Sequence, residues 1–427
     1  MKAVSVALFA GVASLAFVHP VSAGAKTKES VLHSFGSGTD GQYAVSGLLD
    51  VKGKFYGTTE RGGASGNGAV FALDPRTGAE TVLYSFCSQQ NCADGQFPYS
   101  SLIDVNGTLY GTTQAGGGGN CSQFGSDGCG TVFAIDPGTG AETVVYSFIG
   151  GDSGDGWQPS AGLIDVKGTL YGTTSQGGTH AQDTHGYGTV FALDPTTGKE
   201  TVLHAFCSEQ NCADGGTPLA GLIEANGTLY GTTNWGGGVS NNGADSLGVV
   251  FAMDLKAGGE KVLHAFCSTG FPCTDGAYPA ASLVDVNGTL YGTTTASGSG
   301  SGCQAYQGCG EVFAVDAKTG KETVVYSFCS QTDCRDGEFP YAGLIDVKGT
   351  LYGTTEEGGK YESGLGTVFA VDAKSGAETV LYSFCKQQLC VDGQNPDAGL
   401  MDVKGTLYGT TKEGGAAGLG TVFAIRK

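Results

Sequence analysis

Short runs of β-branched and aromatic residues alternate with glycine-rich turns along almost the whole chain. In one representative stretch the apolar runs predict strands at 162–166, 169–174, 189–194 and 200–206. These runs are apolar on one face, and in places on both, which is typical of sheets packed on neighbouring sheets. Extended helical periodicity is absent from the sequence, so the pattern predicts an all-β protein.

Tight turns join these strands into two hairpins. Lys167-Gly168 connects the first pair of strands, and a short Pro-containing turn at 195–199 connects the second pair. In other parts of the chain Asn-Gly takes the place of Lys-Gly, at Asn106, Asn226 and Asn287. Asn-Gly suits a type I′ turn because both central residues need positive φ. The unit is therefore expected to be a four-stranded antiparallel meander.

The same unit recurs along the chain, marked by the tetrapeptide Tyr-Gly-Thr-Thr. Its seven copies begin at Tyr56, Tyr110, Tyr171, Tyr230, Tyr291, Tyr352 and Tyr408. A unit that recurs at nearly constant spacing and contains four short strands is typical of a propeller blade. We therefore predict one domain, 24–427, folded as a seven-bladed β-propeller of four-stranded antiparallel blades. The blades are expected at about 43–86, 101–148, 161–206, 220–266, 281–328, 342–384 and 398–427.

The two ends of the repeat array complement each other. The last unit stops after its third strand, whereas the run at 30–35 matches the fourth strand of the other units. We therefore expect 30–35 to form the outer strand of blade seven and to close the ring. Closure of this kind removes sheet edges that would otherwise be free to aggregate.

The N-terminal residues predict export. Lys2, the apolar run at 3–18 and the small residues Val21-Ser22-Ala23 indicate a signal peptide at 1–23. No further apolar stretch predicts a membrane span, and no anchor follows the last blade, so a secreted or periplasmic monomer is expected. The formal net charge of −19 repels phosphate backbones and disfavours nucleic-acid partners.

The longer loops are expected on one face of the ring, which is the face where binding is predicted, because only these loops vary in length and chemistry. They also hold all 14 cysteines, in closely spaced pairs that an exported chain would form as disulfides. The predicted pairs are Cys87–Cys92, Cys121–Cys129, Cys207–Cys212, Cys267–Cys273, Cys303–Cys309, Cys329–Cys334 and Cys385–Cys390.

Every loop between blades carries an Asp-Gly pair. The aspartates are Asp40, Asp94, Asp155, Asp214, Asp275, Asp336 and Asp392. One interpretation is a turn aspartate that accepts hydrogen bonds from backbone amides. The other is an acidic ring near the channel mouth that holds a cation. We favour the turn, because a cation site rarely needs seven equal ligands.

Features that occur only once are the other candidates for a specific site. An insertion in blade three brings His180, Asp183 and His185 together, either as transition-metal ligands or as solvated side chains, so metal binding stays open. The two tryptophans, Trp157 and Trp235, lie in the variable loops. They could stack on a sugar ring or simply cover apolar loop surface.

The repeat itself resembles a known family. The string GLIDVKGTLYGTT, a Gly-Gly loop and GTVFALD are similar to the tandem repeat of the GloVer-type bacterial exported proteins, named choice-of-anchor tandem repeat proteins. The resemblance runs from residue 31 to the C-terminus. It implies bacterial export and propeller-like repeats, and it carries no established activity. A weaker resemblance, at 188–200, is to pyrroloquinoline-quinone-type propeller repeats, and it concerns architecture alone.

The sequence favours binding over catalysis. It contains no recognisable Ser-His-Asp arrangement, metal-ligand motif or phosphate loop, and no cofactor is expected. The leading hypothesis is an exported non-catalytic binding propeller whose ligand is an extracellular polysaccharide or a surface protein. One alternative is a polysaccharide lyase or hydrolase that uses carboxylates of the loop face. Another is a structural scaffold of the cell envelope.

Overall fold

The computed structural model describes residues 28–427 except 37, 120, 122–127, 151–153, 179–185, 239–246, 271–272, 297–308 and 362–363. The predicted signal peptide, the insertion with His180, Asp183 and His185, and the predicted disulfide partner Cys303 lie outside the described residues. Within the described ranges no helix is both long enough and apolar enough to cross a membrane.

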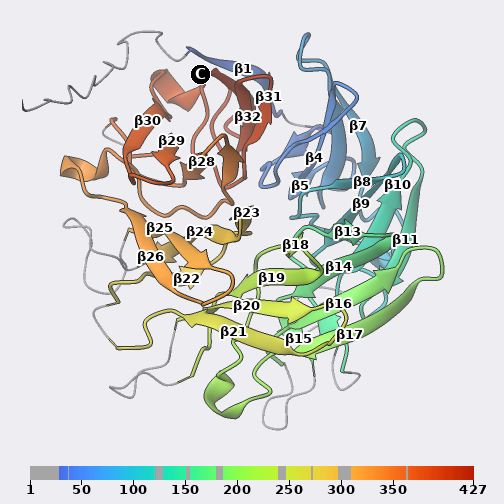
Figure 1. The fold of residues 1–427 in the computed structure, drawn as a ribbon. Coiled ribbons are helices and arrows are strands. Elements are labelled where there is room, and N and C mark those ends of the chain that lie inside the picture. The colour runs from blue at the N-terminus through green and yellow to red at the C-terminus, as the bar shows by residue number, and fades with distance from the viewer. Residues whose placement is uncertain are drawn as a thin grey trace, which may run out of the picture.

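The described residues form seven four-stranded antiparallel blades arranged in a ring, as predicted (Figure 1). Blades one and two are β3(Leu49–Val51), β4(Lys54–Thr59), β6(Ala69–Leu73), β7(Glu80–Ser85) and β8(Ile103–Val105), β9(Thr108–Thr113), β10(Thr131–Ile135), β11(Glu142–Ser147). Blades three and four are β13(Ile164–Val166), β14(Thr169–Thr174), β16(Thr189–Asp194), β17(Lys199–Ala205) and β18(Ile223–Ala225), β19(Thr228–Thr233), β20(Val249–Asp254), β21(Glu260–Ala265). Blades five and six are β23(Val284–Val286), β24(Thr289–Ala296), β25(Glu311–Asp316), β26(Glu322–Ser327) and β27(Ile345–Val347), β28(Thr350–Thr355), β29(Thr367–Asp372), β30(Glu378–Ser383). Blade seven is β31(Met401–Val403), β32(Thr406–Thr411), β33(Thr421–Arg426) and β1(Lys28–Ser34).

Short elements decorate the loops. β2(Gly41–Gln42) pairs with β5(Arg61–Gly62), β12(Gly156–Trp157) pairs with β15(Gln176–Gly177), and β22(Ala277–Pro279) pairs with the end of β24. Among the described residues, 3-10 turns lie in the loops between blades at η1(Gln90–Cys92), η4(Gln210–Cys212), η5(Thr332–Cys334) and η6(Gln388–Cys390).

The first strand of each blade lies at the centre of the ring. Successive first strands contact one another in the order β3, β8, β13, β18, β23, β27 and β31. The fourth strands, such as β17 and β21, lie at the periphery (Figure 1). The loops that enter the first strands therefore converge on the axis of the ring, and the loops that leave the fourth strands start at its outer rim.

The ring closes as the sequence predicts. β1 pairs antiparallel with β33, with Val31 opposite Phe423 and Ser34 opposite Thr421. The strand begins at Lys28, earlier than the predicted 30–35, because Lys28 still pairs with Arg426 at the end of β33. The first segment of the described chain therefore supplies the fourth strand of the last blade.

The predicted hairpin turns are also confirmed. Lys167 and Gly168 have φ values of 56° and 87°, as a type I′ turn requires. The Asp165 carboxylate accepts a 2.9 Å hydrogen bond from the amide of Gly168, which explains the aspartate of the IDV run. Asn-Gly turns adopt the same geometry, for example Asn106 at 55° and Gly107 at 89°.

Aromatic rings of neighbouring blades pack against each other. Phe206 directly follows the fourth strand of blade three, and its ring contacts that of Phe251 in the third strand of blade four at 5.2 Å. Phe251 also lies over Gly231, the glycine of the Tyr-Gly-Thr-Thr motif, where an added Cβ would come within 2.6 Å of the ring. The glycine thus makes room for the ring on which the preceding blade packs.

Threonine hydroxyls add a second, polar connection between blades. Thr112 in blade two donates a hydrogen bond to the carbonyl of Ala161 at 3.1 Å, at the entrance to blade three. The same bond links each other blade to the next, from Thr58 to Ser100, Thr173 to Ala220, Thr232 to Ala281, Thr293 to Ala342, Thr354 to Ala398, and Thr410 to Ser46.

Candidate functional site

A pocket of about 870 Å³ opens on the loop face, and we call it the central pocket. Residues of blades two to seven line it, from Tyr99 in blade two to Lys412 in blade seven. Side chains of so many blades can meet only near the axis of the ring. The pocket is of a size that suits small ligands such as oligosaccharides.

Two positions of the repeat supply most of this lining. The first follows the proline of the Asp-Gly loop and is occupied by Val45 (after Ala44), Tyr99, Ser160, Leu219, Ala280, Tyr341 and Asp397. The second follows Tyr-Gly-Thr-Thr and is occupied by Glu60, Gln114, Ser175, Asn234, Thr295, Glu356 and Lys412. The residue directly before each position is nearly constant, a proline (Ala44 in blade one) before the first and a threonine before the second, whereas the two positions themselves differ from blade to blade.

A backbone clamp holds both positions in every blade. The residue before the proline, or before Ala44 in blade one, has a φ between 53° and 59°, although it is never glycine. The series is Tyr43, Phe97, Gln158, Thr217, Tyr278, Phe339 and Asn395. The amide of Phe97 donates to the carbonyl of Asn67 at 2.8 Å, and the amide of Gln114 donates to the carbonyl of Phe97 at 3.0 Å. A non-glycine residue at positive φ is strained and persists only when such contacts hold it. The clamp therefore fixes a constant frame that presents variable side chains.

Among the charged groups that line the central pocket, Asp397 is the most buried. Its side chain is 11% exposed, and the Lys412 ammonium lies 3.5 Å from one of its carboxylate oxygens. The other oxygen, Oδ1, is buried without a hydrogen-bond partner. Burial raises the pKa of Asp397 to about 6, and Lys412 opposes that rise. Burial alone would lower the pKa of Lys412, but the neighbouring acidic groups, Asp397 first, raise it instead.

Two tyrosines and a glutamate complete the polar side of the central pocket. Tyr341 is 43% exposed, which leaves its ring accessible to a ligand. Burial, followed by the charge of Asp397, raises the pKa of Tyr99 to about 12, so its hydroxyl remains protonated. Burial and the repulsion of Asp397 raise the pKa of Glu356 to about 7. The pocket thus combines an accessible aromatic ring, hydrogen-bonding groups and an excess of carboxylates.

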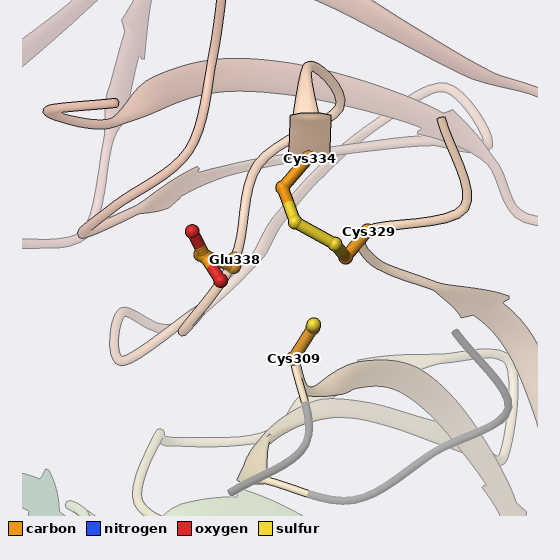
Figure 2. A group of neighbouring side chains, drawn as sticks. All are labelled: Cys309, Cys329, Cys334 and Glu338. Atoms are coloured by element: carbon orange, nitrogen blue, oxygen red, sulfur yellow. A yellow bond between two sulfur atoms is a disulfide. The ribbon is translucent and has the colours of Figure 1, made fainter. Parts of the chain in front are cut away.

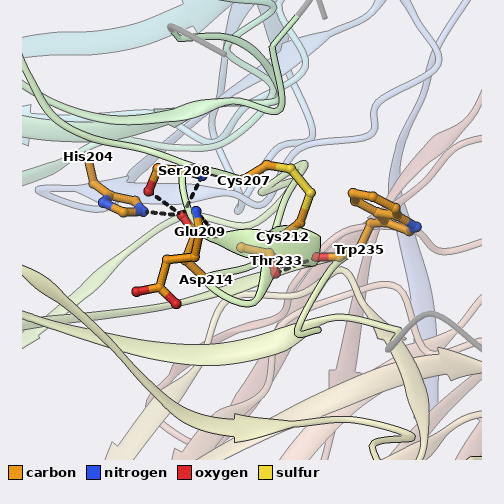
Figure 3. Close-up of polar contacts among 8 residues, drawn as sticks. All are labelled: His204, Cys207, Ser208, Glu209, Cys212, Asp214, Thr233 and Trp235. Atoms are coloured by element: carbon orange, nitrogen blue, oxygen red, sulfur yellow. Dashed lines mark hydrogen bonds and ion pairs between the residues drawn. A yellow bond between two sulfur atoms is a disulfide. The ribbon is translucent and has the colours of Figure 1, made fainter. Parts of the chain in front are cut away.

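The Asp-Gly aspartates occupy a different part of the molecule. Asp214 accepts hydrogen bonds from the amides of Ser208 and Glu209 at 3.0 and 3.2 Å, and it lies 3.1 Å from Nε2 of His204 on the outermost strand β17 (Figure 3). At four other blades a tyrosine hydroxyl of the outermost strand donates to the aspartate instead, from Tyr84, Tyr146, Tyr326 and Tyr382. These contacts are those of the turn interpretation. They correct the expected position at the channel mouth, because the fourth strands form the outer rim.

Each of these aspartates faces a glutamate of the next blade, and we call each such contact a seam. Asp94 follows the fourth strand of blade one, and its charge acts on Glu142 in the fourth strand of blade two. The glutamates of the seven seams are Glu29, Glu80, Glu142, Glu200, Glu260, Glu322 and Glu378, and each has a buried Oε1 without a hydrogen-bond partner. Burial is the main cause that raises their pKa, to about 8 for Glu260 and about 7 for the others.

The two tryptophans are placed differently. Trp157 is only 4% exposed and packs in a cluster with Cys121 and Cys129. Its ring is therefore not available to a sugar, which corrects the prediction of a binding role for this residue. Trp235 is half-buried, and Tyr187 stacks on it with ring centroids 5.2 Å apart and planes at 15°. One face of Trp235 is thus already covered, and a ligand role for it stays a prediction.

Six of the predicted disulfides are formed among the described residues. Cys309 is disulfide-bonded as well, and its predicted partner Cys303 lies outside the described residues. Figure 2 shows Cys309, Cys329, Cys334 and Glu338 gathered in one place. Metals bind cysteine as the thiolate, which a disulfide sulfur cannot provide. Glu338 is therefore the one residue of this group that could act as a metal ligand.

Sequence reasoning missed the central pocket, although the signal was present. Alignment of the seven units shows two positions that change in size, charge and polarity, although a nearly constant proline precedes the first and a constant threonine precedes the second. Variation directly beside constant positions of an internal repeat indicates that the variable positions are shaped for something other than the fold. The Asp-Gly aspartates were candidates for a site because they recur in every unit, but their recurrence reflects a structural role in the loops.

Comparison with known proteins agrees with this architecture. The family model of the Gloeobacter/Verrucomicrobia repeat matches residues 18–151, 119–306 and 301–427. A search of curated proteins finds no significant match. Among solved structures, an oligogalacturonate lyase in complex with manganese is similar at 11% identity and a TM-score of 0.52, over 94% of this chain and 96% of that one. An oligogalacturonate lyase from Vibrio parahaemolyticus is similar at 9% identity and a TM-score of 0.49, over 94% and 97% of the two chains. At these identities the similarity concerns the fold alone.

Proposed function

Because the chain belongs to the Gloeobacter/Verrucomicrobia repeat family, we propose that it is an exported binding propeller whose central pocket takes an uncharged or amino-bearing oligosaccharide. The observation that carries this proposal is the variation, from blade to blade, of the two repeat positions that supply most of the lining of that pocket. The disulfides of the loop face support an oxidising, extracellular or periplasmic location.

The chemistry of the central pocket suits a sugar. An accessible ring such as that of Tyr341 can stack on the apolar C–H face of a pyranose. The carboxylates and amides of Asp397, Glu356 and Gln114 line the same pocket and can accept or donate hydrogen bonds to hydroxyl groups. Since Asp397 and Glu356 outnumber the one lysine of the lining, Lys412, a uronate would be repelled. Neutral sugars and protonated amino sugars fit this balance of charge.

Binding of the purified chain to a panel of neutral, amino and acidic oligosaccharides tests the proposal. Tyr341→Ala is expected to weaken binding roughly tenfold, because an aromatic contact of about 1.4 kcal/mol corresponds to that factor. Tyr361→Ala is the matched control, since Tyr361 lies in a loop of the same blade outside the lining of the central pocket. Failure to bind any sugar of the panel, or equal affinity of the Tyr341 and control variants, would overturn the proposal.

A catalytic function is the second candidate, because the same pocket holds two carboxyl groups with raised pKa. The pKa of Asp397 is about 6 and that of Glu356 about 7, in the range useful for general acids and bases. A hydrolase or lyase would release reducing ends or unsaturated products from a polysaccharide panel. Activity that disappears in Asp397→Asn and Glu356→Gln would favour this candidate, and binding without any product would favour the first.

A further inference from the structure

The seam that closes the ring carries a cluster of side chains that sets it apart. His33 lies on β1, Asp40 lies in the loop that follows, and Glu80 lies on β7 of blade one. The three offer one ligand atom each, and these atoms lie within 4.8 Å of one another. In the part of the chain that the structure describes, one other group of potential metal ligands occurs. It is the group of Figure 2, whose three cysteines are disulfide-bonded.

Two of the three side chains offer a buried atom without a hydrogen-bond partner. Nε2 of His33 and Oε1 of Glu80 are buried and have no hydrogen-bond partner. Unpaired buried polar atoms are costly, and two of them at one point indicate a missing partner. The cluster is also held in place. The amides of Gly36 and Gly41 donate to the Asp40 carboxylate at 2.6 and 2.8 Å, and the edge of the His33 ring contacts Phe35 at 5.0 Å.

The other seams show what the ordinary arrangement is. Four of them have a tyrosine in place of His33, and its hydroxyl donates to the aspartate. The remaining two have His204 and His264, whose Nε2 atoms lie 3.1 and 3.2 Å from their aspartates. Asp214, beside His204, also accepts from both the amide and the hydroxyl of Ser208 (Figure 3). At the closing seam the imidazole stands 3.5 Å from Asp40.

We propose that the closing seam binds a divalent transition-metal ion, of which Zn²⁺ is the representative, through His33, Asp40 and Glu80. The imidazole is a borderline ligand that favours Zn²⁺ and similar ions over Ca²⁺, and Zn²⁺ also accepts the oxygens of the two carboxylates. In a tetrahedral site with metal–ligand bonds of about 2.1 Å, the ligand atoms lie about 3.4 Å apart. The 3.5 Å between Nε2 of His33 and Oδ2 of Asp40 already matches that spacing. A water molecule would fill the fourth position.

The position of the site gives the ion a structural role. His33 belongs to the strand that completes blade seven, and Glu80 belongs to the outermost strand of blade one. An ion held by both would fasten the first and last blades together at the outer rim. It would also neutralise the two neighbouring carboxylates of Asp40 and Glu80. The proposal is independent of what the central pocket binds, because the closing seam lies at the outer rim and the pocket lies at the axis.

Calorimetric titration of the chelator-treated chain with Zn²⁺ tests the proposal. His33→Tyr introduces the residue that four other seams carry, so it is expected to preserve the fold and to weaken binding at least a hundredfold. Glu80→Gln is expected to weaken binding roughly tenfold and to keep the shape of the side chain. His204→Tyr is the matched control, because it makes the same substitution at a seam whose imidazole is already engaged with Asp214. This control is expected to bind Zn²⁺ as the unaltered chain does.

Thermal unfolding with and without Zn²⁺ provides a second measurement of binding. Zn²⁺ is expected to raise the Tm of the unaltered chain and of His204→Tyr, to raise that of Glu80→Gln by less, and to leave the Tm of His33→Tyr unchanged. A variant with both His180 and His185 changed to alanine should keep the effect, which separates the closing seam from the insertion in blade three. The proposal is overturned if the unaltered chain does not bind Zn²⁺, if His33→Tyr binds it equally well, or if the double alanine variant alone loses it.

Discussion

The hydroxyl of Thr410 donates a 3.0 Å hydrogen bond to the carbonyl of Ser46, a residue 364 positions earlier in the chain. The bond is the last of the series that links each blade to the next, and it joins blade seven to the entrance of blade one. The pairing of β1 with β33 closes the same ring at the periphery. The two contacts together show that closure is secured both near the axis and at the rim.

Loss of the Thr410 hydroxyl should weaken the closed ring. Thr410 is 1% exposed, so Thr410→Val would leave the Ser46 carbonyl without this donor. We expect a loss of about 1–3 kcal/mol in the free energy of unfolding, measured by urea denaturation. Thr410→Ser keeps the hydroxyl and serves as the control. A valine variant as stable as the serine variant would contradict the proposed role of the bond.

The glycine of the Tyr-Gly-Thr-Thr motif should resist even a small side chain. Gly231→Ala would place a Cβ 2.6 Å from the ring of Phe251, so the variant is expected to lose about 1–3 kcal/mol of stability. Phe251→Leu in the same chain should recover part of that loss, because it removes the ring. Gly118→Ala is the control, since a Cβ there meets nothing within 4 Å. Thermal unfolding of the unaltered chain, the two alanine variants and the double variant measures these differences in stability. Equal Tm values for Gly231→Ala and Gly118→Ala would count against the packing argument.

The seam glutamates should make the protein less stable as the pH rises. Burial raises the pKa of Glu260 from 4.5 to about 8 in the folded chain, so between these values the folded chain binds a proton that the unfolded chain has released. The free energy of unfolding contributed by this group therefore falls as the pH rises through that window. We expect a lower Tm at pH 8.5 than at pH 5, with the six other seam glutamates contributing in the same direction.

Substitution of Glu260 by glutamine should isolate this effect. Glutamine mimics the protonated carboxyl, so Glu260→Gln is expected to raise stability at pH 8.5 by about 1 kcal/mol after allowance for solvent screening, and to change little at pH 5. Glu224→Gln is the control, because Glu224 is exposed and its Oε1 accepts a hydrogen bond from Gly227 that an amide oxygen can keep. An unaltered pH profile in Glu260→Gln would refute the assignment.

The loop disulfides should stabilise the protein modestly without defining the fold. Cys385–Cys390 closes a loop with a sequence separation of 5, and so short a loop contributes about 2 kcal/mol in the chain-entropy model. Serine at both positions is expected to lower stability by about that amount and to leave the far-ultraviolet circular dichroism unchanged. Mass spectrometry of the oxidised chain checks the pairing first. A variant that no longer folds would show that the disulfide does more than stiffen a loop.

The sequence by itself determined the architecture of this protein, because the relevant signals are local. Apolar alternation, turns such as Lys167-Gly168 and the recurring motif fix strand, hairpin and blade within one unit. The count of units and the spare strand predicted at 30–35 then determine a closed ring of seven blades, as the pairing of β1 with β33 confirms. Each step depends on residues close together in the chain or on matching one copy with another.

Only the tertiary structure decided which side chains meet. Tyr99 and Asp397 line one pocket because the ring brings the entrances of distant blades to a common axis. Trp157 is buried because the Cys121–Cys129 disulfide of the neighbouring loop packs against it. His33 approaches Glu80 because closure places the first described strand beside blade one. Such proximities follow from the curvature of the assembled ring, which no local propensity of the chain encodes.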